Sequence, residues 1–174
     1  MRGKMTKEQF TELVLQAEST LFHVAFSILH HEADCADAVQ EAVTKAYASR
    51  ENLRDCRYFR TWLVRILINE CYGILRSRNR QLPMDCESME KQGRNKNPEN
   101  YIKEEYLDLY YAIGQLKEKD KMCIVLFYLE DYTVVQIADI LDIPEGTVKS
   151  RLNRARGKLR GLLEDGGDTA ATGG

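Results

Sequence analysis

Residues 133–160 constrain the fold most, because they show the pattern of two amphipathic helices separated by a tight turn. Thr133 and Gln136 stand at capping-box spacing, at which a hydroxyl and an amide each satisfy a free backbone N–H at a helix start. An apolar stripe follows at helical spacing, made of Ile137, Ile140 and Leu141. The residue before a proline avoids helical dihedrals, so Ile143-Pro144 predicts the end of this helix and a turn.

A second helix is predicted to begin near Pro144, whose fixed φ suits a first helical turn. Its inward face is apolar and consists of Val148, Leu152, Ala155 and Leu159. Its opposite side is polar and basic, with Lys149, Ser150, Asn153 and Arg154, and with Arg156 and Arg160 beside them. Between residues 144 and 160, six lysines and arginines stand against the single acid Glu145, which suits contact with phosphate. The pattern indicates a helix-turn-helix DNA reader, the alternative being a solvated basic helix.

Composition limits where nucleic acid can bind. The chain has 174 residues, of which 44% are hydrophobic and 30% charged, as is typical of a soluble globular protein. Its formal net charge is −2, so contacts with DNA must come from local patches. Residues 54–80 form a second such patch, with seven arginines and two acids, which predicts a second DNA contact.

An acidic stretch lies between the N-terminus and this patch and contains Glu32, Asp34, Asp37 and Glu41. Such a stretch repels DNA and attracts a basic protein surface. We interpret it as a face for a protein partner, the alternative being ordinary solvated helix acids.

The sequence predicts neither a metal site nor a cofactor. Its five cysteines are scattered without a Cys-x-x-Cys pair, which favours reduced cytosolic thiols. The alternative metal group, formed by His23, His30, His31 and Cys35, is interpreted as ordinary helix residues. We find no phosphate-binding glycine loop and no nucleophile with a placed base, so we expect no enzyme activity. The N-terminus lacks the apolar core of a signal peptide and no run approaches ~18 apolar residues, so we predict a cytoplasmic protein without membrane insertion.

Helical periodicity dominates the chain, which predicts an all-α fold. Two N-terminal stripes are expected to be buried: Leu21, Ala25, Ile28 and Leu29, then Ala36, Val39, Val43, Ala46 and Tyr47. Thr61 is predicted to cap a third helix, and Trp62 to fill the core beneath it. The buried stripe of that helix is Leu63, Ile66, Leu67, Cys71, Ile74 and Leu75. Its opposite row is Arg65, Asn69, Tyr72 and Arg76, a combination that can hold phosphates, bond a base edge and stack on a base.

These stripes define two small helical domains joined by a flexible linker. The first domain is predicted at residues 10–80, and the linker, where the apolar period is lost, at residues 81–100. The second domain is predicted at residues 101–163, and the tail 164–174 is expected to be disordered. The first apolar stripes of the second domain are Ile102, Tyr106, Leu109 and Ile113, then Met122, Val125, Leu126 and Leu129.

Three segments carry a resemblance to a known family. DCADAVQEAVTKAY at residues 34–47 and FRTWLVRILINECYGILR at residues 59–76 look like region two of bacterial sigma factors. QIADILDIPEGTVKSRLNRARGKLR at residues 136–160 resembles their region four. Two such regions joined by a short linker are similar to the extracytoplasmic-function class of the sigma-70 family. The resemblance covers most of residues 10–163 in the right order.

The resemblance implies a subunit that binds core RNA polymerase, directs it to promoter DNA and helps separate the strands, without a catalytic site. In the family, the helix that here holds Asp37, Gln40 and Glu41 docks on the coiled coil of the largest polymerase subunit. The segment at residues 52–58, with Leu53, resembles the one that captures a flipped base of the minus-ten element. Asn69 matches a position that contacts a minus-ten base, and the helical face adds Arg65, Tyr72 and Arg76.

In region four, the resemblance aligns four residues with positions that meet the minus-thirty-five element: Lys149, Ser150, Asn153 and Arg154. Arg154 is the strongest specificity candidate, because arginine can make bidentate contacts to guanine. Pro144 stands where a serine or a similar helix cap is frequent in the family, and Asn153 stands at a position where other members vary widely, which leaves the promoter sequence open. We expect a monomer when free, held inactive by an anti-sigma factor that can be membrane-bound. The alternative function is a stand-alone helix-turn-helix transcription regulator, which usually needs a dimer.

Overall fold

The computed structural model describes residues 5–81 and 107–167, and the chain divides into two compact units, residues 1–95 and 96–174. Every regular element in the described ranges is helical, so the predicted all-α class with two helical domains is confirmed. Beyond Gln81 the predicted linker lies outside the described residues, as do Ile102 and Tyr106. None of the described helices is long and apolar enough to cross a membrane.

The first unit begins with a capping box that the sequence analysis missed. In front of α1 (Lys7–Leu29), the Gln9 N–H donates to Thr6 Oγ1 at 3.2 Å and the Thr6 N–H donates to Gln9 Oε1 at 3.0 Å. The helix ends at His30, whose φ of 55° places it in the left-handed region. Helix α1 therefore has a defined start and end, and the next helix begins at Glu32.

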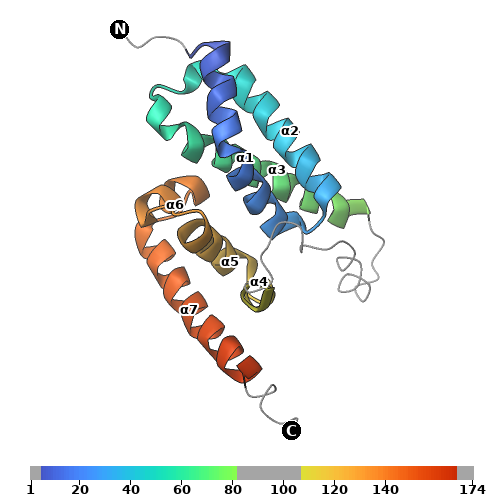
Figure 1. The fold of residues 1–174 in the computed structure, drawn as a ribbon, viewed down its shortest axis with the longest axis vertical. Helices are drawn as coiled ribbons and strands as arrows, with labels where there is room; N and C mark the ends of the chain where they lie inside the picture. The colour runs from blue at the N-terminus through green and yellow to red at the C-terminus, as the bar shows by residue number, and fades with distance from the viewer. Residues whose placement is uncertain (1–4, 82–106, 168–174) are drawn as a thin grey trace. The chain divides into compact units, whose positions relative to one another are not determined.

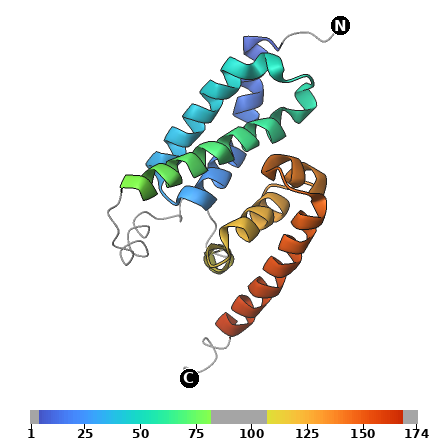
Figure 2. The ribbon, with the colours of Figure 1, turned by 180° about the vertical axis from the view of Figure 1, so that it is seen from behind.

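Helix α2 (Glu32–Ser49) packs against α1 and α3 through very small side chains (Figures 1 and 2). Its buried residues are Cys35, Ala38, Ala42 and Ala46. The predicted stripe was wrong at Ala36 and Tyr47, which are exposed, while Val39 and Val43 are half-buried. Short side chains let neighbouring helices approach closely, so here the alanines rather than the valines face the core.

Helix α3 (Phe59–Gln81) begins earlier than predicted. Two short turns precede it, η1 (Arg50–Asn52) and η2 (Cys56–Tyr58). The Asp55 side chain accepts the Arg57 N–H at 2.9 Å and caps the second turn, which runs directly into α3. Thr61 therefore lies inside the helix, and its predicted capping role was wrong.

The core of the first unit is centred on Phe59 rather than on Trp62. Phe59 is 1% exposed and its ring lies edge-on to that of Phe10, with 5.4 Å between centroids. Trp62 is only half-buried against Phe59, so the prediction that it fills the core was wrong. In the predicted stripe of α3, Leu63, Leu67 and Cys71 are buried, whereas Ile66, Ile74 and Leu75 are half-buried.

The second unit contains α4 (Leu107–Gly114), α5 (Glu118–Ile124), the π-helical segment η5 (Val125–Leu129), α6 (Val134–Leu141) and α7 (Glu145–Gly167). The segment η5 continues α5 with a wider turn, closed by the Glu130 N–H on the Val125 carbonyl at 3.2 Å. Helix α7 continues to Gly167, past residue 163, where the second domain was expected to end. Residues 168–174 of the expected tail lie outside the described residues.

The helix-turn-helix has the local structure that the sequence predicts. The Gln136 N–H donates to Thr133 Oγ1 at 3.2 Å and the Thr133 N–H to Gln136 Oε1 at 2.9 Å, so the capping box of α6 is confirmed. Asp142 ends α6 with a φ of 54°, a left-handed conformation that aspartate tolerates. The Pro144 carbonyl then accepts the Thr147 and Val148 N–H groups, which starts α7.

Candidate nucleic-acid interface

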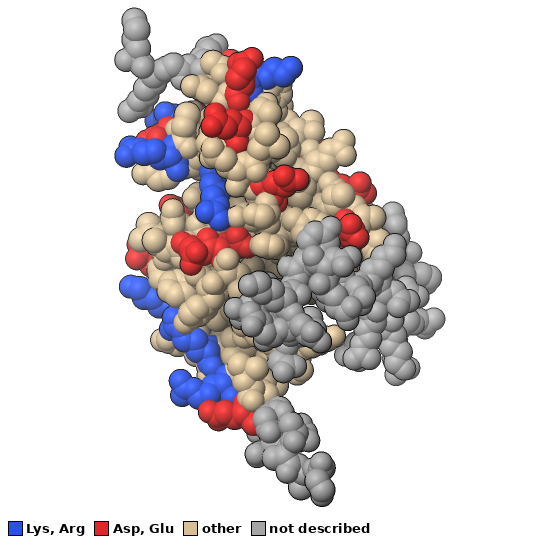
Figure 3. Space-filling view, in the orientation of Figure 1, with Lys and Arg blue, Asp and Glu red and all other residues tan. Residues whose placement is uncertain are grey.

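Helix α7 separates an apolar and a basic face, as predicted. Val148, Leu152 and Ala155 are 0%, 2% and 1% exposed and pack inward, while Leu159 of the predicted face is half-buried. The four candidate DNA-binding residues of this helix are all exposed: Lys149, Ser150, Asn153 and Arg154. Figure 3 shows a line of lysine and arginine side chains along α7. A helix of this kind can lie in a major groove with its cations near phosphates.

Arg154 is held by an acid that the sequence analysis did not identify. Its Nε donates to Asp120 Oδ2 at 2.8 Å and its Nη2 donates to Asp120 Oδ1 at 2.5 Å. The hydrogen bonds from Arg154 lower the pKa of Asp120, against the opposing effect of burial, so the carboxylate stays ionised. The two residues are 34 positions apart, and no local spacing signals such a pair.

Asn153 is oriented by a neighbouring arginine. Arg156 Nη1 donates to Asn153 Oδ1 at 3.1 Å, while Arg156 Nε donates to the hydroxyl of Tyr128 at 2.6 Å. The Arg156 guanidinium also lies 5.7 Å and 5.5 Å from the ring centroids of Phe127 and Tyr128. Arginine has no acceptor, so the Asn153 oxygen must face it and the amide nitrogen keeps two donors for another partner.

Ser150 and Lys158 make contacts within the unit. Ser150 Oγ donates to the Thr147 carbonyl at 3.0 Å, which leaves the hydroxyl oxygen as an acceptor. Lys158 Nζ donates to the Gln115 carbonyl at 3.0 Å and so ties α7 to the turn after α4.

The predicted row on α3 lies on one side of that helix. Arg65, Asn69 and Arg76 are exposed and Tyr72 is half-buried. The spacing of these residues alternates between three and four, so they follow one helical face. The structure thus brings the four predicted side chains of this row together along α3.

Leu53 lies between the two short turns that precede α3 and is half-buried. Tyr58, at the end of the same segment, is 58% exposed and was not singled out from the sequence. The sequence does contain a signal for Tyr58, because a tyrosine in a polar turn is expected to be exposed and an exposed ring can stack on an unpaired base.

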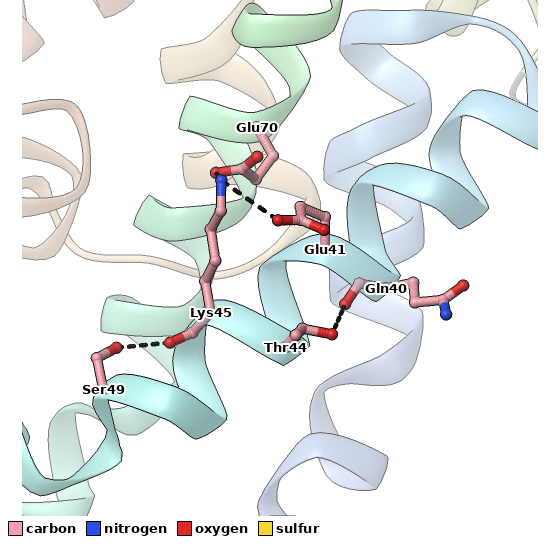
Figure 4. A network of polar contacts seen from close by, with 6 residues as sticks. All are labelled: Gln40, Glu41, Thr44, Lys45, Ser49 and Glu70. Carbon is pink, nitrogen blue, oxygen red and sulfur yellow. Dashed lines mark hydrogen bonds and ion pairs between the residues drawn. The ribbon is translucent and has the colours of Figure 1, made fainter.

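The acidic face of α2 consists of Asp37, Gln40 and Glu41, all exposed. Their spacing of three and four places them on one side of the helix. Figure 4 shows Lys45 beside this face, with Nζ 3.5 Å from Glu41 Oε1 and 2.8 Å from Glu70 Oε1 of α3. The Gln40 side chain points away from that network, and the backbone carbonyl of Gln40 accepts the Thr44 hydroxyl at 2.8 Å.

The described cysteines differ in accessibility. Cys35, Cys71 and Cys123 are buried, and Cys56 is exposed. Burial raises the pKa of Cys35 to about 11 and that of Cys71 to about 12, so both thiols stay protonated near neutral pH. In the described ranges, no three His, Cys, Asp or Glu side chains gather as a group that could hold a metal ion.

Two family models match the chain in the order of its two units. The model of Sigma-70 region 2 matches residues 13–81, and the model of Sigma-70, region 4 matches residues 106–159. The first match contains the candidate residues of α2 and α3, and the second contains those of α7.

Curated relatives extend over almost the whole chain. The RNA polymerase sigma factor SigV of Bacillus subtilis strain 168 is 31% identical over 159 residues, which cover 91% of this chain and 93% of SigV. The ECF RNA polymerase sigma-E factor of Escherichia coli K12 is 32% identical over 178 residues, covering 90% of this chain and 93% of that protein.

Solved structures show the same architecture. The sigma factor RpoE from Bartonella quintana, solved in complex with the anti-sigma factor NepR, has a TM-score of 0.78 at 27% identity and covers 90% of this chain and 98% of that one. CnrH, solved with the cytosolic domain of CnrY, has a TM-score of 0.69 at 24% identity, covers 92% of this chain and 90% of that one, and supports the fold alone. The chain therefore belongs to the sigma-70 family, as a sigma factor of the extracytoplasmic-function class.

Proposed function

We propose that this sigma factor, which binds core RNA polymerase and directs transcription initiation at promoters, divides its work among three surfaces. The acidic face of α2 binds polymerase, the α3 row and the segment before it bind the minus-ten element, and the basic face of α7 binds the minus-thirty-five element. The observation that carries the proposal is the helix-turn-helix, in which α6 begins with a capping box and α7 has a buried apolar face opposite an exposed basic face. The stand-alone regulator is disfavoured, because the relatives named above are sigma factors that match both units.

Polymerase binding is assigned to Asp37, Gln40 and Glu41. Within the described ranges no ion pair of Asp37 is found. The single positive charge of Lys45 lies near two carboxylates, Glu41 and Glu70, so it compensates Glu41 only in part. This face therefore keeps negative charge to attract a basic partner, here the coiled coil of the largest polymerase subunit. Charge complementarity of this kind contributes mainly to association rate and register.

Strand separation is assigned to α3 and the segment before it. Extruding a base costs a few kcal/mol, which contacts to the unpaired base must offset. Leu53 and the exposed Tyr58 supply apolar and aromatic contacts, and Asn69 supplies hydrogen bonds to a base edge. Arg65 and Arg76 are placed along the same face for phosphates, with Tyr72 between them. The energy for opening comes from binding, so the proposal requires no catalytic group in this chain and no cofactor.

Recognition of the upstream element is assigned to α7. Lys149 binds phosphate, while Ser150, Asn153 and Arg154 face base edges. Asn153 offers donors through its amide nitrogen, because its oxygen is occupied by Arg156. Ser150 offers an acceptor, because its proton is on the Thr147 carbonyl.

We further propose that the chain acts in the cytoplasm, where polymerase is found, and that an anti-sigma factor covers its binding faces. The related RpoE was solved with such a protein, which supports this assignment. Affinity purification of the tagged chain from its native host tests it. Recovery of a stoichiometric protein that core polymerase displaces is the expected result, and recovery of polymerase alone would contradict it.

Promoter opening is the experiment that tests the main proposal. Holoenzyme assembled from core polymerase and the full chain is expected to open a promoter selected from a random DNA library, as reported by a fluorescent base analogue in the minus-ten element. Asn69→Ala should slow opening at least tenfold while binding to core polymerase is unchanged. Gln16→Ala, which removes an exposed amide of α1 outside the three proposed surfaces, is the matched control. Equal opening rates for Asn69→Ala and the control would contradict the assignment.

A further inference from the structure

The contact between Arg154 and Asp120 occupies one defined edge of the guanidinium. Nε and Nη2, which donate to the carboxylate, lie on the same side of the planar group. The five N–H donors of arginine have a fixed geometry, so the second hydrogen of Nη2 and one hydrogen of Nη1 form a parallel pair on the end of the group. That second edge has the geometry for a bidentate contact to guanine.

The burial of the two partners is unequal. The Asp120 side chain is 5% exposed and the Arg154 side chain is 60% exposed. A buried carboxylate on α5 therefore anchors a guanidinium that still reaches solvent from α7. An exposed arginine without an anchor would sample many rotamers, and ordering it on DNA would cost binding free energy.

The same contact alters the charge that DNA meets. A paired arginine and carboxylate have no net charge, so Arg154 adds little to the long-range attraction of phosphates. Its remaining donors keep their direction. The pair therefore weakens binding to unrelated DNA and preserves hydrogen bonding to one base edge, and both effects increase discrimination.

We propose that Asp120 is a positioning residue for base recognition, which holds the Nε edge of Arg154 so that its outer edge meets a base in the major groove. The inference rests on the proposed role of α7 in reading the upstream element. Asp120 acts through Arg154 and does not itself contact DNA. The competing explanation is a purely structural ion pair between α5 and α7.

The test is a selection with complete holoenzyme. Core polymerase is assembled with the full chain or with Asp120→Asn, Arg154→Ala or the double variant, and each selects from duplexes randomised across the upstream element. Base preference at each position and affinity for an unrelated duplex are measured, together with the thermal midpoint of each free variant. Glu164→Gln, an exposed acid on α7, is the matched control for the change in charge.

Arg154→Ala is expected to lose about tenfold of base preference at one position. Asp120→Asn should lose most of that preference at the same position while its affinity for the unrelated duplex is equal or higher. The double variant should match Arg154→Ala. Arg154→Lys, which keeps the charge beside an intact Asp120 but has no second edge, should also lose the preference.

Two results separate failure of this inference from failure of the proposed function. If Arg154→Ala loses the preference and Asp120→Asn retains it, or weakens all duplexes equally, the positioning role is overturned and base reading by α7 stands. If Arg154→Ala changes no position, Arg154 does not read a base, and that part of the proposed function fails together with the inference.

Discussion

Lys45 of α2 and Glu70 of α3 form an ion pair between the two helices, with 2.8 Å from Lys45 Nζ to Glu70 Oε1. The hydrogen bond to Glu70 raises the pKa of Lys45, so the ammonium stays charged at any physiological pH. The same ammonium lies 3.5 Å from Glu41 Oε1. One cation thus connects the helix that we assign to polymerase binding with the helix that we assign to strand separation.

Removal of this cation should change the rate of polymerase binding. Lys45→Met removes a positive charge beside the acids of α2 and so makes this face more negative. Association with core polymerase is therefore expected to become several-fold faster at low salt. The gain should shrink toward zero near 1 M salt, where the Debye length is about 3 Å. Stopped-flow fluorescence measures the association rate of the parent and of the variant at low and at high salt. The control is Lys7→Met, which removes an exposed lysine at the start of α1. Slower association of Lys45→Met would contradict the prediction and would mean that Lys45 itself contacts polymerase.

The capping box of α6 should stabilise the second unit measurably. Thr133→Ala removes the acceptor of the Gln136 N–H and is expected to cost about 1 kcal/mol of unfolding free energy. Urea denaturation followed by circular dichroism measures the change. Thr133→Ser, which keeps the hydroxyl oxygen, should recover most of the loss. If the alanine and serine variants unfold at the same urea concentration, the cap does not contribute as described.

Stability should fall above about pH 9 because of two buried thiols. Burial raises the pKa of Cys35 to about 11 and that of Cys71 to about 12, above the ordinary thiol value of 9.0. Between these values the unfolded chain releases thiol protons that the folded chain retains, so each increment of pH favours unfolding. Below pH 9 both states are protonated and the contribution is constant.

Urea denaturation at several pH values measures this effect. Lysines and tyrosines also titrate in the same range, so the informative quantity is a difference. The double variant Cys35→Ala/Cys71→Ala should show a smaller decrease in unfolding free energy between pH 9 and pH 11 than the parent protein. Identical slopes for the two proteins would refute the assignment to these thiols.

Much of the fold follows from local rules that the sequence displays. The capping box at Thr133, the turn before Pro144 and the buried face of α7 depend on neighbours within one or two helical turns, so spacing alone predicts them. The same rule also marks Thr6 and Gln9 at the start of α1, whose capping box has the same spacing.

The errors concern choices that tertiary packing makes. The sequence favours the larger Val39 and Val43 of α2 for the core, but close approach of three helices selects the alanines instead. Phe59 lies in the core because α3 starts at this residue, one helical turn before the buried Leu63, whereas Trp62 lies beside that stripe. The contact of Arg154 with Asp120 could not be predicted, because it depends on how α5 and α7 cross and no periodicity encodes that.

Co-elution with core RNA polymerase is the sharpest test of docking through α2. The purified chain is mixed with core polymerase and passed over a size-exclusion column, with the double variant Asp37→Lys/Glu41→Lys and the control Glu18→Lys, an exposed acid of α1, run in parallel. We predict co-elution of the parent and the control, and loss of co-elution for the double variant at unchanged helix content. Failure of the parent chain to co-elute, or co-elution of the folded double variant, would contradict a sigma factor that docks through α2.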